Sequence, residues 1–190
     1  MTSNSSNKIG HVAIIMDGNS RWARQRNLKT IEGHKQGVNR LRDIVKYSAK
    51  SEITHLSVFA FSTENWKRSA SDVSDLMKLF LQSIIKEVPE LIENKVQLNF
   101  IGDIPRFSKS LVSQINSAMK DTQAKKPNLN LNVAISYGGR WDILNAIKRI
   151  KDHKINTDKL SEDDFSNLLS TSDFPDPDLL IRTGDEIRIS

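Results

Sequence analysis

Short apolar runs that alternate with helical patterns constrain the fold of this chain more than any other feature. The first run, residues 12–16, has neither helical spacing nor polar alternation, and three of its residues are β-branched. Such a run indicates a strand that is buried on both faces, as in a parallel sheet. Comparable runs recur along the chain, the last of them also predicted to be buried. The predicted strands are residues 12–16, 54–61, 96–101, 129–137 and 178–181.

The segments between these runs predict helices. Apolar residues recur at spacings of three and four from Gly33 to Ala49, and a capping-box pattern at residues 69–72 starts a long helix through Ile92. The other expected helices contain residues 111–119, 138–150 and 161–169. Strands that alternate with helices through right-handed connections imply a single-domain α/β fold, with a mostly parallel central sheet and helices on both faces.

Composition narrows the classes of function. A net charge of +5 allows an anionic partner, such as nucleic acid, a phosphorylated small molecule or a membrane surface. The absence of cysteine excludes disulfides, zinc thiolate sites and a cysteine nucleophile, and it agrees with a reducing cytoplasm. Aromatic residues make up only 6% and lie mostly in apolar positions, so we expect no nucleic-acid partner. We expect a flexible polar tail at residues 1–8 and one domain from 9 to 190.

Polar residues directly follow several predicted strands. Ligands of open α/β sheets bind beyond the carboxyl ends of the strands, so these residues are expected to share one functional edge. The set comprises Asp17, Asn19, Arg21, Ser62, Asn65, Arg68, Arg182 and Arg188, together with His34 at the expected start of a helix. For the segment 17–19 alone, an ordinary strand-ending turn is the alternative.

Arginines dominate this set, and their chemistry indicates a phosphorylated ligand. Guanidinium groups bind phosphate oxygens in a bidentate manner, and a single carboxylate among cations is suited to hold a divalent metal on a phosphate. The residues therefore predict a diphosphate ligand with Mg²⁺, although a salt bridge could explain any one arginine. The apolar stripe of the helix that ends near Ile92 fits an ordinary core and also the wall of a hydrocarbon tunnel.

Five segments together resemble the cis-prenyltransferase family, and they occur in the family's order. These segments are residues 11–23, 33–34, 61–68, 137–142 and 182–184. The resemblance implies a Mg²⁺-dependent reaction in which isopentenyl diphosphate repeatedly extends an allylic diphosphate such as farnesyl diphosphate. Each new double bond would be cis, and the expected product is a long-chain polyprenyl diphosphate, of the undecaprenyl type used as a lipid carrier in cell-wall synthesis.

The resemblance also implies roles for individual residues. Asp17 would be the metal and diphosphate residue, and Asn65 would assist proton loss. The residues expected to bind the allylic diphosphate or the reacting chain are Gly18, Asn19, Arg21, Trp22, Lys29, His34, Ser62, Glu64, Trp66 and Arg68. The residues expected to bind isopentenyl diphosphate are Arg182, Arg188 and Ser190.

The chain departs from the family pattern at two positions and at its end. Thr30 stands where the family usually has an arginine, and Asp185 replaces the second glycine of the R-T-G-G-E segment. The family continues beyond Ser190 with a further strand, a carboxylate that helps to hold Mg²⁺ and a closing helix. The resemblance implies a homodimer, and the lipid product suggests a cytoplasmic protein with peripheral contact to the membrane. A non-catalytic accessory or truncated member that binds prenyl diphosphate without turnover is the alternative.

Overall fold

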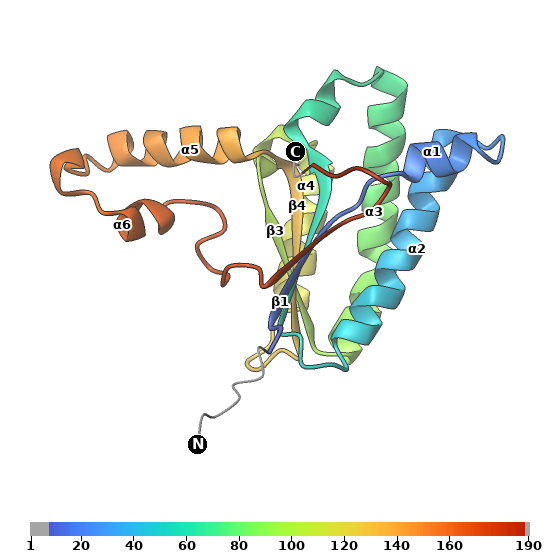
Figure 1. The fold of residues 1–190 in the computed structure, drawn as a ribbon, viewed down its shortest axis with the longest axis horizontal. Coiled ribbons are helices and arrows are strands. Elements are labelled where there is room, and N and C mark those ends of the chain that lie inside the picture. Colours follow the sequence, from blue (N-terminus) through green and yellow to red (C-terminus); the bar gives the residue numbers. More distant parts are fainter. Residues whose placement is uncertain (1–7, 189–190) are drawn as a thin grey trace.

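All five predicted strands are present, and they form one parallel sheet in the computed structural model (Figure 1). The structure describes residues 8–188. The strands are β1 (His11–Ile15), β2 (His55–Ser62), β3 (Val96–Ile101), β4 (Leu129–Tyr137) and β5 (Leu179–Arg182). Their order in the sheet is β3-β4-β2-β1-β5, and every neighbouring pair is parallel. The predicted α/β fold with a parallel sheet is confirmed.

Six helices connect the strands in the described part of the chain. They are α1 (Asn19–Arg24), α2 (Thr30–Ser48), α3 (Ala70–Glu93), α4 (Lys109–Asp121), α5 (Gly139–Asp152) and α6 (Glu162–Ser166), with short 3-10 turns η1 (Thr63–Lys67), η2 (Ile104–Arg106) and η3 (Thr157–Lys159). The predicted start of the long helix is confirmed, since the Ser69 hydroxyl accepts a hydrogen bond from the Asp72 backbone N–H at 3.2 Å; of the predicted capping box, this is the half that the structure shows. None of the described helices is both long enough and apolar enough to span a bilayer.

The helices between β1 and β2 differ from the sequence-based predictions. The polar segment after β1 was expected to be a turn, but helix α1 begins at Asn19, directly after Gly18 takes a left-handed conformation (φ 93°). Helix α2 begins at Thr30 rather than near Gly33. His34 therefore lies in the second turn of α2, where backbone N–H groups belong to the helix ladder. The prediction that His34 lies at the start of this helix is therefore wrong.

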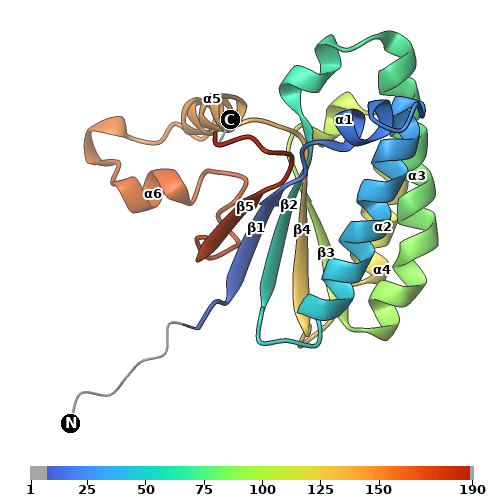
Figure 2. The same ribbon diagram turned by 45° about the vertical axis from the view of Figure 1, so that its right-hand side comes forward.

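Helices α2, α3 and α4 cover one face of the sheet (Figure 2). Alternate strand residues such as Leu56, Val58 and Leu131 point toward these helices and form the core. On the other side of the sheet, α5 and α6 extend away from the strands instead of lying along them, so they cover little of that face. Predicted helix 161–169 is also shorter, and turns replace its second half.

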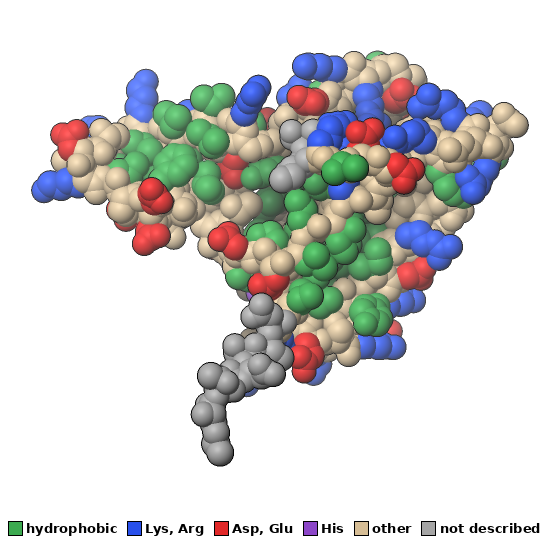
Figure 3. Space-filling view, in the orientation of Figure 1, with side chains coloured by type: hydrophobic (Ala, Val, Ile, Leu, Met, Phe, Trp, Pro, Cys, Tyr) green, Lys and Arg blue, Asp and Glu red, His purple; other side chains and the backbone are tan. Residues whose placement is uncertain are grey.

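Strand β5 was predicted to be buried, and this prediction is wrong. It lies at the edge of the sheet, beside β1 only, and Leu179, Leu180 and Ile181 are exposed. Hydrophobic side chains also remain exposed on α5, at Ile143, Leu144 and Ile147. Figure 3 shows hydrophobic side chains gathered on the side of the molecule that carries α5 and β5. An apolar run indicates a strand, but it does not reveal which neighbours cover that strand.

Hydrogen bonds at its start hold β5 against β1. The Asp178 carboxylate accepts the backbone N–H groups of Gly10 and His11, each at 2.8 Å. The His11 ring lies between the Pro175 carbonyl (Nδ1, 2.6 Å) and the Ser57 hydroxyl (Nε2, 2.8 Å). A carbonyl only accepts, so Nδ1 carries the proton and Nε2 accepts from Ser57. These bonds set the register that brings the end of β5 beside the end of β1.

Candidate active site

The carboxyl ends of β1 and β5 form the centre of the candidate site. The β1–β5 register pairs Ile15 with Arg182, so the loops that follow both strands start side by side. Asp17 Oδ2 accepts a hydrogen bond from Arg182 Nη2 at 2.8 Å. Arg182 Nη1 also donates to the Arg188 backbone carbonyl at 2.8 Å. The sequence-based prediction that Asp17 and Arg182 share one edge is therefore confirmed.

The two loops are also joined through their backbones. Thr183 Oγ1 donates to the Asp17 carbonyl at 2.6 Å and accepts from the Asp17 N–H at 2.9 Å. Gly18 and Gly184 both have positive φ, and a Cβ built on Gly18 would lie 2.9 Å from the Gly184 Cα. Only glycine fits this approach without displacing backbone. The contact fixes the Asp17 carboxylate relative to the β5 loop.

Three arginines and two carboxylates form a continuous network at this edge. Arg21 Nη1 lies 3.3 Å from Glu186 Oε1, and Arg188 Nε lies 3.1 Å from Glu186 Oε2. Arg21 also lies 3.7 Å from Asp17 and donates to the Gly184 carbonyl. The network carries a net positive charge, and its own carboxylates hold the arginines in place. It provides guanidinium groups for an anionic ligand, as the sequence predicted for Arg21, Arg182 and Arg188.

The network keeps Asp17 ionised. Partial burial raises the pKa of the Asp17 carboxyl, but hydrogen bonds from Arg182 and the Gly18 N–H, with the charges of Arg182 and Arg21, outweigh burial. The pKa of Asp17 is therefore below its ordinary value. Glu186 behaves similarly, because its hydrogen bond to Arg188 and the charges of Arg188 and Arg21 lower the pKa of its carboxyl. Both groups are anionic near neutral pH.

Asn19 packs closely against α2, because two residues of that helix that face it, Gly33 and Gly37, have no side chain. A Cβ on Gly33 would lie 2.0 Å from the Asn19 backbone oxygen, and a Cβ on Gly37 would lie 2.8 Å from the Asn19 side chain. The absence of side chains at these positions lets α1 pack closely on α2. Asn19 and Trp22 thereby line the same pocket as Asp17, Gly18 and Arg21, as predicted.

A second polar pocket brings together the predicted cations Lys29 and Arg68 with His34 and Thr30. Burial lowers the pKa of the His34 imidazole, and the nearby Arg68 charge lowers it further, against the opposing effect of Asp72. His34 is therefore mostly neutral at pH 7. Its Nε2 atom is buried and has no hydrogen-bond partner among residues 8–188. An unpaired buried imidazole nitrogen is suited to a hydrogen bond with a ligand.

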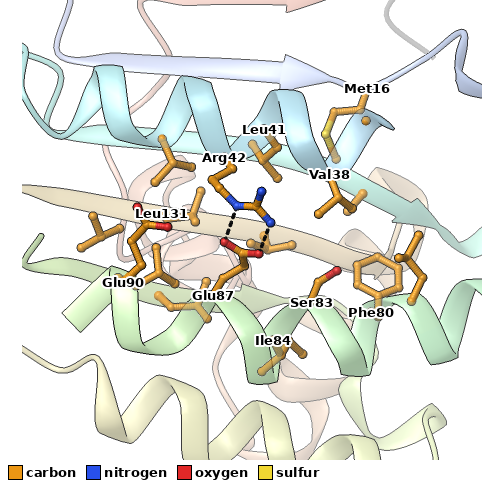
Figure 4. A pocket seen from close by; sticks show the side chains of 18 of the residues that line it. Met16, Val38, Leu41, Arg42, Phe80, Ser83, Ile84, Glu87, Glu90 and Leu131 are labelled. Atoms are coloured by element: carbon orange, nitrogen blue, oxygen red, sulfur yellow. Dashed lines mark hydrogen bonds and ion pairs between the residues drawn. The ribbon is translucent and has the colours of Figure 1, made fainter. Parts of the chain in front are cut away.

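An apolar channel extends from this edge between α2, α3 and the sheet (Figure 4). We use this name for the pocket whose lining includes Met16, Val38, Leu41, Phe80, Ile84, Leu91, Leu131 and Val133. Its volume is about 170 Å³. An engineered apolar cavity of about 150 Å³ binds benzene, so a space of this size admits a hydrocarbon group. The long helix is thus both core and channel wall.

The channel and the polar pockets are contiguous. His34 lines both the apolar channel and the Lys29–Arg68 pocket, whereas Met16 and Asn19 line both the channel and the Asp17 pocket. A ligand with a charged head and an apolar tail would therefore find complementary surroundings for both parts.

The residues that follow β2 have structural roles of their own. Ser62 and Asn65 cap η1 reciprocally: Ser62 Oγ accepts from the Glu64 N–H at 2.9 Å, and Asn65 Oδ1 accepts from the Ser62 N–H at 3.0 Å. The Glu64 side chain is exposed.

Trp66 points into an aromatic cluster. Its indole N–H donates to Ser136 Oγ at 2.9 Å, and its ring lies 5.2 Å from Phe61 and 5.4 Å from Phe107 between centroids. In this structure Trp66 supports the end of β2, which is a role that the sequence did not indicate.

The residues present suit Mg²⁺ only together with a phosphorylated ligand. No group of three or more metal-binding side chains occurs within residues 8–188. Mg²⁺ usually keeps several waters and uses one or two carboxylates plus substrate phosphates. Asp17 is an ionised carboxylate beside Arg21 and Arg182, whose guanidinium groups suit phosphate oxygens, so it fits such a shared site. A diphosphate that takes over Arg182 would free Asp17 Oδ2 for the ion.

The sequence-based predictions gave no site role to Glu186 or Gly37, and they included Thr183 and Gly184 only as part of the segment 182–184, without a role of their own. The four-residue spacing of Gly33 and Gly37 is a signal that could have revealed close packing on one face of α2. The pairing of Glu186 with Arg21 has no local signal. Ser190, expected to bind isopentenyl diphosphate, lies outside the described residues, as do residues 1–7 of the predicted tail. Lys8 is exposed and lies 3.3 Å from Glu52.

Comparison with known proteins agrees with the family resemblance of the sequence. Residues 15–190 match the prenyltransferase family whose description reads "Putative undecaprenyl diphosphate synthase". The isoprenyl transferase of Neisseria meningitidis serogroup A is 46% identical over 180 residues, which cover 95% of this chain and 71% of the relative. A Coxiella burnetii protein is 45% identical over 184 residues, covering 95% and 77%. It is named ditrans,polycis-undecaprenyl-diphosphate synthase ((2E,6E)-farnesyl-diphosphate specific).

Solved structures agree in fold. Lavandulyl diphosphate synthase from Lavandula x intermedia, in complex with dimethylallyl diphosphate, superposes with a TM-score of 0.90 at 34% identity, covering 96% of this chain and 80% of that chain. A probable undecaprenyl diphosphate synthase from Campylobacter jejuni gives a TM-score of 0.79 at 30% identity, covering 97% and 79%.

Proposed function

Because this chain belongs to the undecaprenyl diphosphate synthase family of prenyltransferases, we propose that it extends an allylic prenyl diphosphate with isopentenyl diphosphate to give cis-polyprenyl diphosphate. The observation that supports this proposal is the direct contact between an arginine-rich edge and an apolar channel. Diphosphate groups require cations, whereas a prenyl chain requires an apolar surface. A farnesyl-type primer and an undecaprenyl-type product follow the names of the relatives.

In the proposed reaction, the allylic C–O bond breaks and its electron pair leaves with the diphosphate. The isopentenyl double bond then forms a carbon–carbon bond to the allylic carbon, and the resulting cation transfers a proton to the released diphosphate or to water, which creates the new double bond. Arg21, Arg182 and Arg188 stabilise the negative charge that develops on the leaving group and on the second diphosphate. The buried Nε2 of His34 donates or accepts a hydrogen bond at the junction between head and tail.

Two assignments depend on the resemblance more than on contacts in the structure. Asp17 would hold Mg²⁺, which would neutralise diphosphate charge when bound. Asn65 would orient the group that loses its proton. Its Oδ1 accepts from the Ser62 N–H, so its Nδ2 is the atom proposed for this role.

The proposal is tested by measuring how much labelled isopentenyl diphosphate enters butanol-extractable product when farnesyl diphosphate is the primer. Product that forms with Mg²⁺ and disappears with excess EDTA supports both the reaction and the metal. If no product forms while the protein is folded by circular dichroism and still binds farnesyl diphosphate, the non-catalytic alternative replaces the synthase assignment.

The homodimer and the peripheral membrane contact also belong to this proposal. Exposed apolar side chains on α5 and β5 offer a surface that a second copy would cover, which supports the dimer. Light scattering after size-exclusion chromatography tests the dimer, and co-sedimentation with anionic vesicles tests the membrane contact. A monomer that stays in the supernatant would contradict both.

A further inference from the structure

Ser136, the second-last residue of β4, has a backbone conformation that serine rarely adopts. Its φ is 48°, in the left-handed region that favours glycine, asparagine and aspartate. Of the non-glycine residues within 8–188 that have a positive φ, only Ser136 is buried. A residue persists in such a conformation only when its surroundings hold it there, and such residues cluster at functional sites. The contacts of Ser136 therefore indicate what its conformation serves.

The side chain of Ser136 holds the ring of Trp66. The indole N–H of Trp66 donates to Ser136 Oγ at 2.9 Å, across 70 positions of sequence. The same ring packs against Phe61 and Phe107, and the Arg106 guanidinium lies 4.6 Å from its centroid. Apolar contacts have little directionality, whereas the hydrogen bond fixes the one polar atom of the ring. Ser136 therefore determines how the Trp66 ring is turned within its cluster.

The neighbouring strand β3 holds the backbone of Ser136 in turn. The Asp103 N–H, just after β3, donates to the Ser136 carbonyl at 3.2 Å. Gly102 permits this close approach, because a Cβ at that position would lie 1.9 Å from the Ile135 carbonyl oxygen. Backbone contacts between the ends of β3 and β4 thus aim the Ser136 hydroxyl at Trp66.

Trp66 belongs to the short turn η1 and directly follows Asn65, the residue proposed to assist proton loss. The same turn also meets the end of β4 near its start, since a Cβ on Gly138 would lie 2.7 Å from Thr63 Oγ1. The turn is therefore held at two points, by close packing at Thr63 and by a hydrogen bond at Trp66. A change in the orientation of Trp66 would displace the residue beside it, because η1 has only five residues.

We propose that Ser136 is a positioning residue for the proposed reaction, in which it acts through Trp66 to hold the Asn65 amide in the geometry for proton loss. This inference rests on the proposed function. A small displacement of a group that acts in the reaction lowers the rate steeply. Substrate binding depends mainly on the arginines of the β1–β5 edge, which Ser136 does not contact. Removal of the Ser136 hydroxyl should therefore lower kcat and leave KM nearly unchanged.

The test is a double-mutant cycle on the full chain. Ser136→Ala removes the hydroxyl, Trp66→Phe removes the indole N–H but keeps an aromatic ring, and a third variant combines the two. Thr122→Ala is the matched control, because the Thr122 hydroxyl is also buried and accepts the Leu98 N–H at 3.1 Å, next to α4 instead of η1. Turnover of isopentenyl and farnesyl diphosphate is measured well below the unfolding temperature of each variant, which circular dichroism determines.

We expect Ser136→Ala to lower kcat by about tenfold, with KM for both substrates within about twofold of the wild type. In the Trp66→Phe background, Ser136→Ala should lower kcat no further, because the hydrogen bond is already absent. Thr122→Ala should lower thermal stability and keep kcat within about twofold of the wild type.

A second measurement does not depend on turnover. In proton–nitrogen NMR spectra, the side-chain amide of Asn65 is assigned by its absence from Asn65→Asp. This resonance should shift in Ser136→Ala and stay in place in Thr122→Ala. The Trp66 indole proton should exchange with solvent faster in Ser136→Ala than in the wild type, since it loses its acceptor.

Several results would overturn the inference and leave the proposed function intact. These are additive effects on kcat in the cycle, an unmoved Asn65 amide in Ser136→Ala, and a Ser136→Ala variant that loses stability alone, as the Thr122→Ala control does. If Ser136→Ala does not fold, Trp66→Phe decides, and an unchanged kcat in that variant overturns the inference. A wild type that makes no product contradicts the proposed function, and the inference fails with it.

Discussion

The carboxylate of Asp17 and the guanidinium of Arg182 lie 2.8 Å apart, although 165 positions separate them in the sequence. The register between β1 and β5 creates this pair, and the contact between Gly18 and Gly184 maintains it. In the proposed reaction the same two groups change partners, since Arg182 turns to a diphosphate and Asp17 to a metal. The pair connects the ends of β1 and β5, and under the proposed function it would also keep the Asp17 carboxylate ionised and in place until the ligands bind.

Replacing Asp17 with asparagine should remove turnover and change stability only modestly. The amide keeps the size of the side chain but not its charge, so Mg²⁺ bound with diphosphate loses its protein ligand. The side chain of Asp17 is 32% exposed, so the loss of its attraction to Arg182 should cost about 1 kcal/mol of unfolding free energy. Labelled-substrate incorporation and urea unfolding measure the two effects. Retained activity would remove Asp17 from its assigned role.

The pKa of His34 predicts a loss of stability in mild acid. Its folded-state pKa lies below the ordinary value of 6.5. As pH falls, the unfolded chain therefore takes up a proton at this histidine before the folded chain does. The contribution of neutral His34 to the free energy of unfolding is complete above pH 6.5 and is lost as pH falls through the folded-state pKa. The variant His34→Gln should lose less unfolding free energy than the wild type between about pH 7 and about pH 5.

His153 provides the control for this measurement, because it is an exposed histidine at the end of α5. The variant His153→Gln should keep the wild-type dependence on pH. Part of the dependence should survive in His34→Gln, since burial and the neighbouring His11 also lower the pKa of His55. Identical pH profiles for His34→Gln and the wild type would contradict the prediction.

Alanine at Gly33 should destabilise the protein, whereas alanine at Gly139 should not. Neither glycine has a positive φ, and alanine has an intrinsic advantage of about 1 kcal/mol inside α2 at Gly33 and a smaller one at Gly139, the first residue of α5. A Cβ at Gly33 would lie 2.0 Å from the Asn19 backbone oxygen, whereas a Cβ at Gly139 would meet nothing within 4 Å. We expect Gly33→Ala to lower unfolding free energy by about 2 kcal/mol or more. Thermal unfolding of Gly33→Ala, Gly139→Ala and the wild type measures the difference in stability.

Removing the charge of Asp185 should strengthen diphosphate binding. Asp185 lines the Asp17 pocket and has a φ of 59°, at the position where the family has glycine. Asp185→Gly relieves the left-handed backbone but adds freedom to the unfolded chain, so stability should change by less than about 1 kcal/mol. Pyrophosphate affinity, measured by calorimetry, should rise roughly threefold through loss of the negative charge. Asp185→Asn isolates the charge effect and should give a similar rise.

Much of the fold could be predicted because its signals are local. The apolar runs of β1 to β4 and the cap at Ser69 depend on neighbouring residues only, and the structure contains them as expected. Helix α1 was missed because its start depends on the backbone conformation of Gly18. The exposure of β5 was missed because burial depends on which elements pack beside a strand, and its own residues are as apolar as those of β1.

The sequence alone determined that this protein has a parallel sheet and that Asp17 and its arginines gather at one edge, because strand ends and polar turns are adjacent in the chain. Only the tertiary structure decided which groups pair there. Glu186 pairs with Arg21, Gly33 leaves room for Asn19, and Arg42 of α2 pairs with Glu87 of α3. All three contacts join elements that packing brings together. Such contacts leave no periodic or local pattern, since their geometry exists only after the helices lie on the sheet.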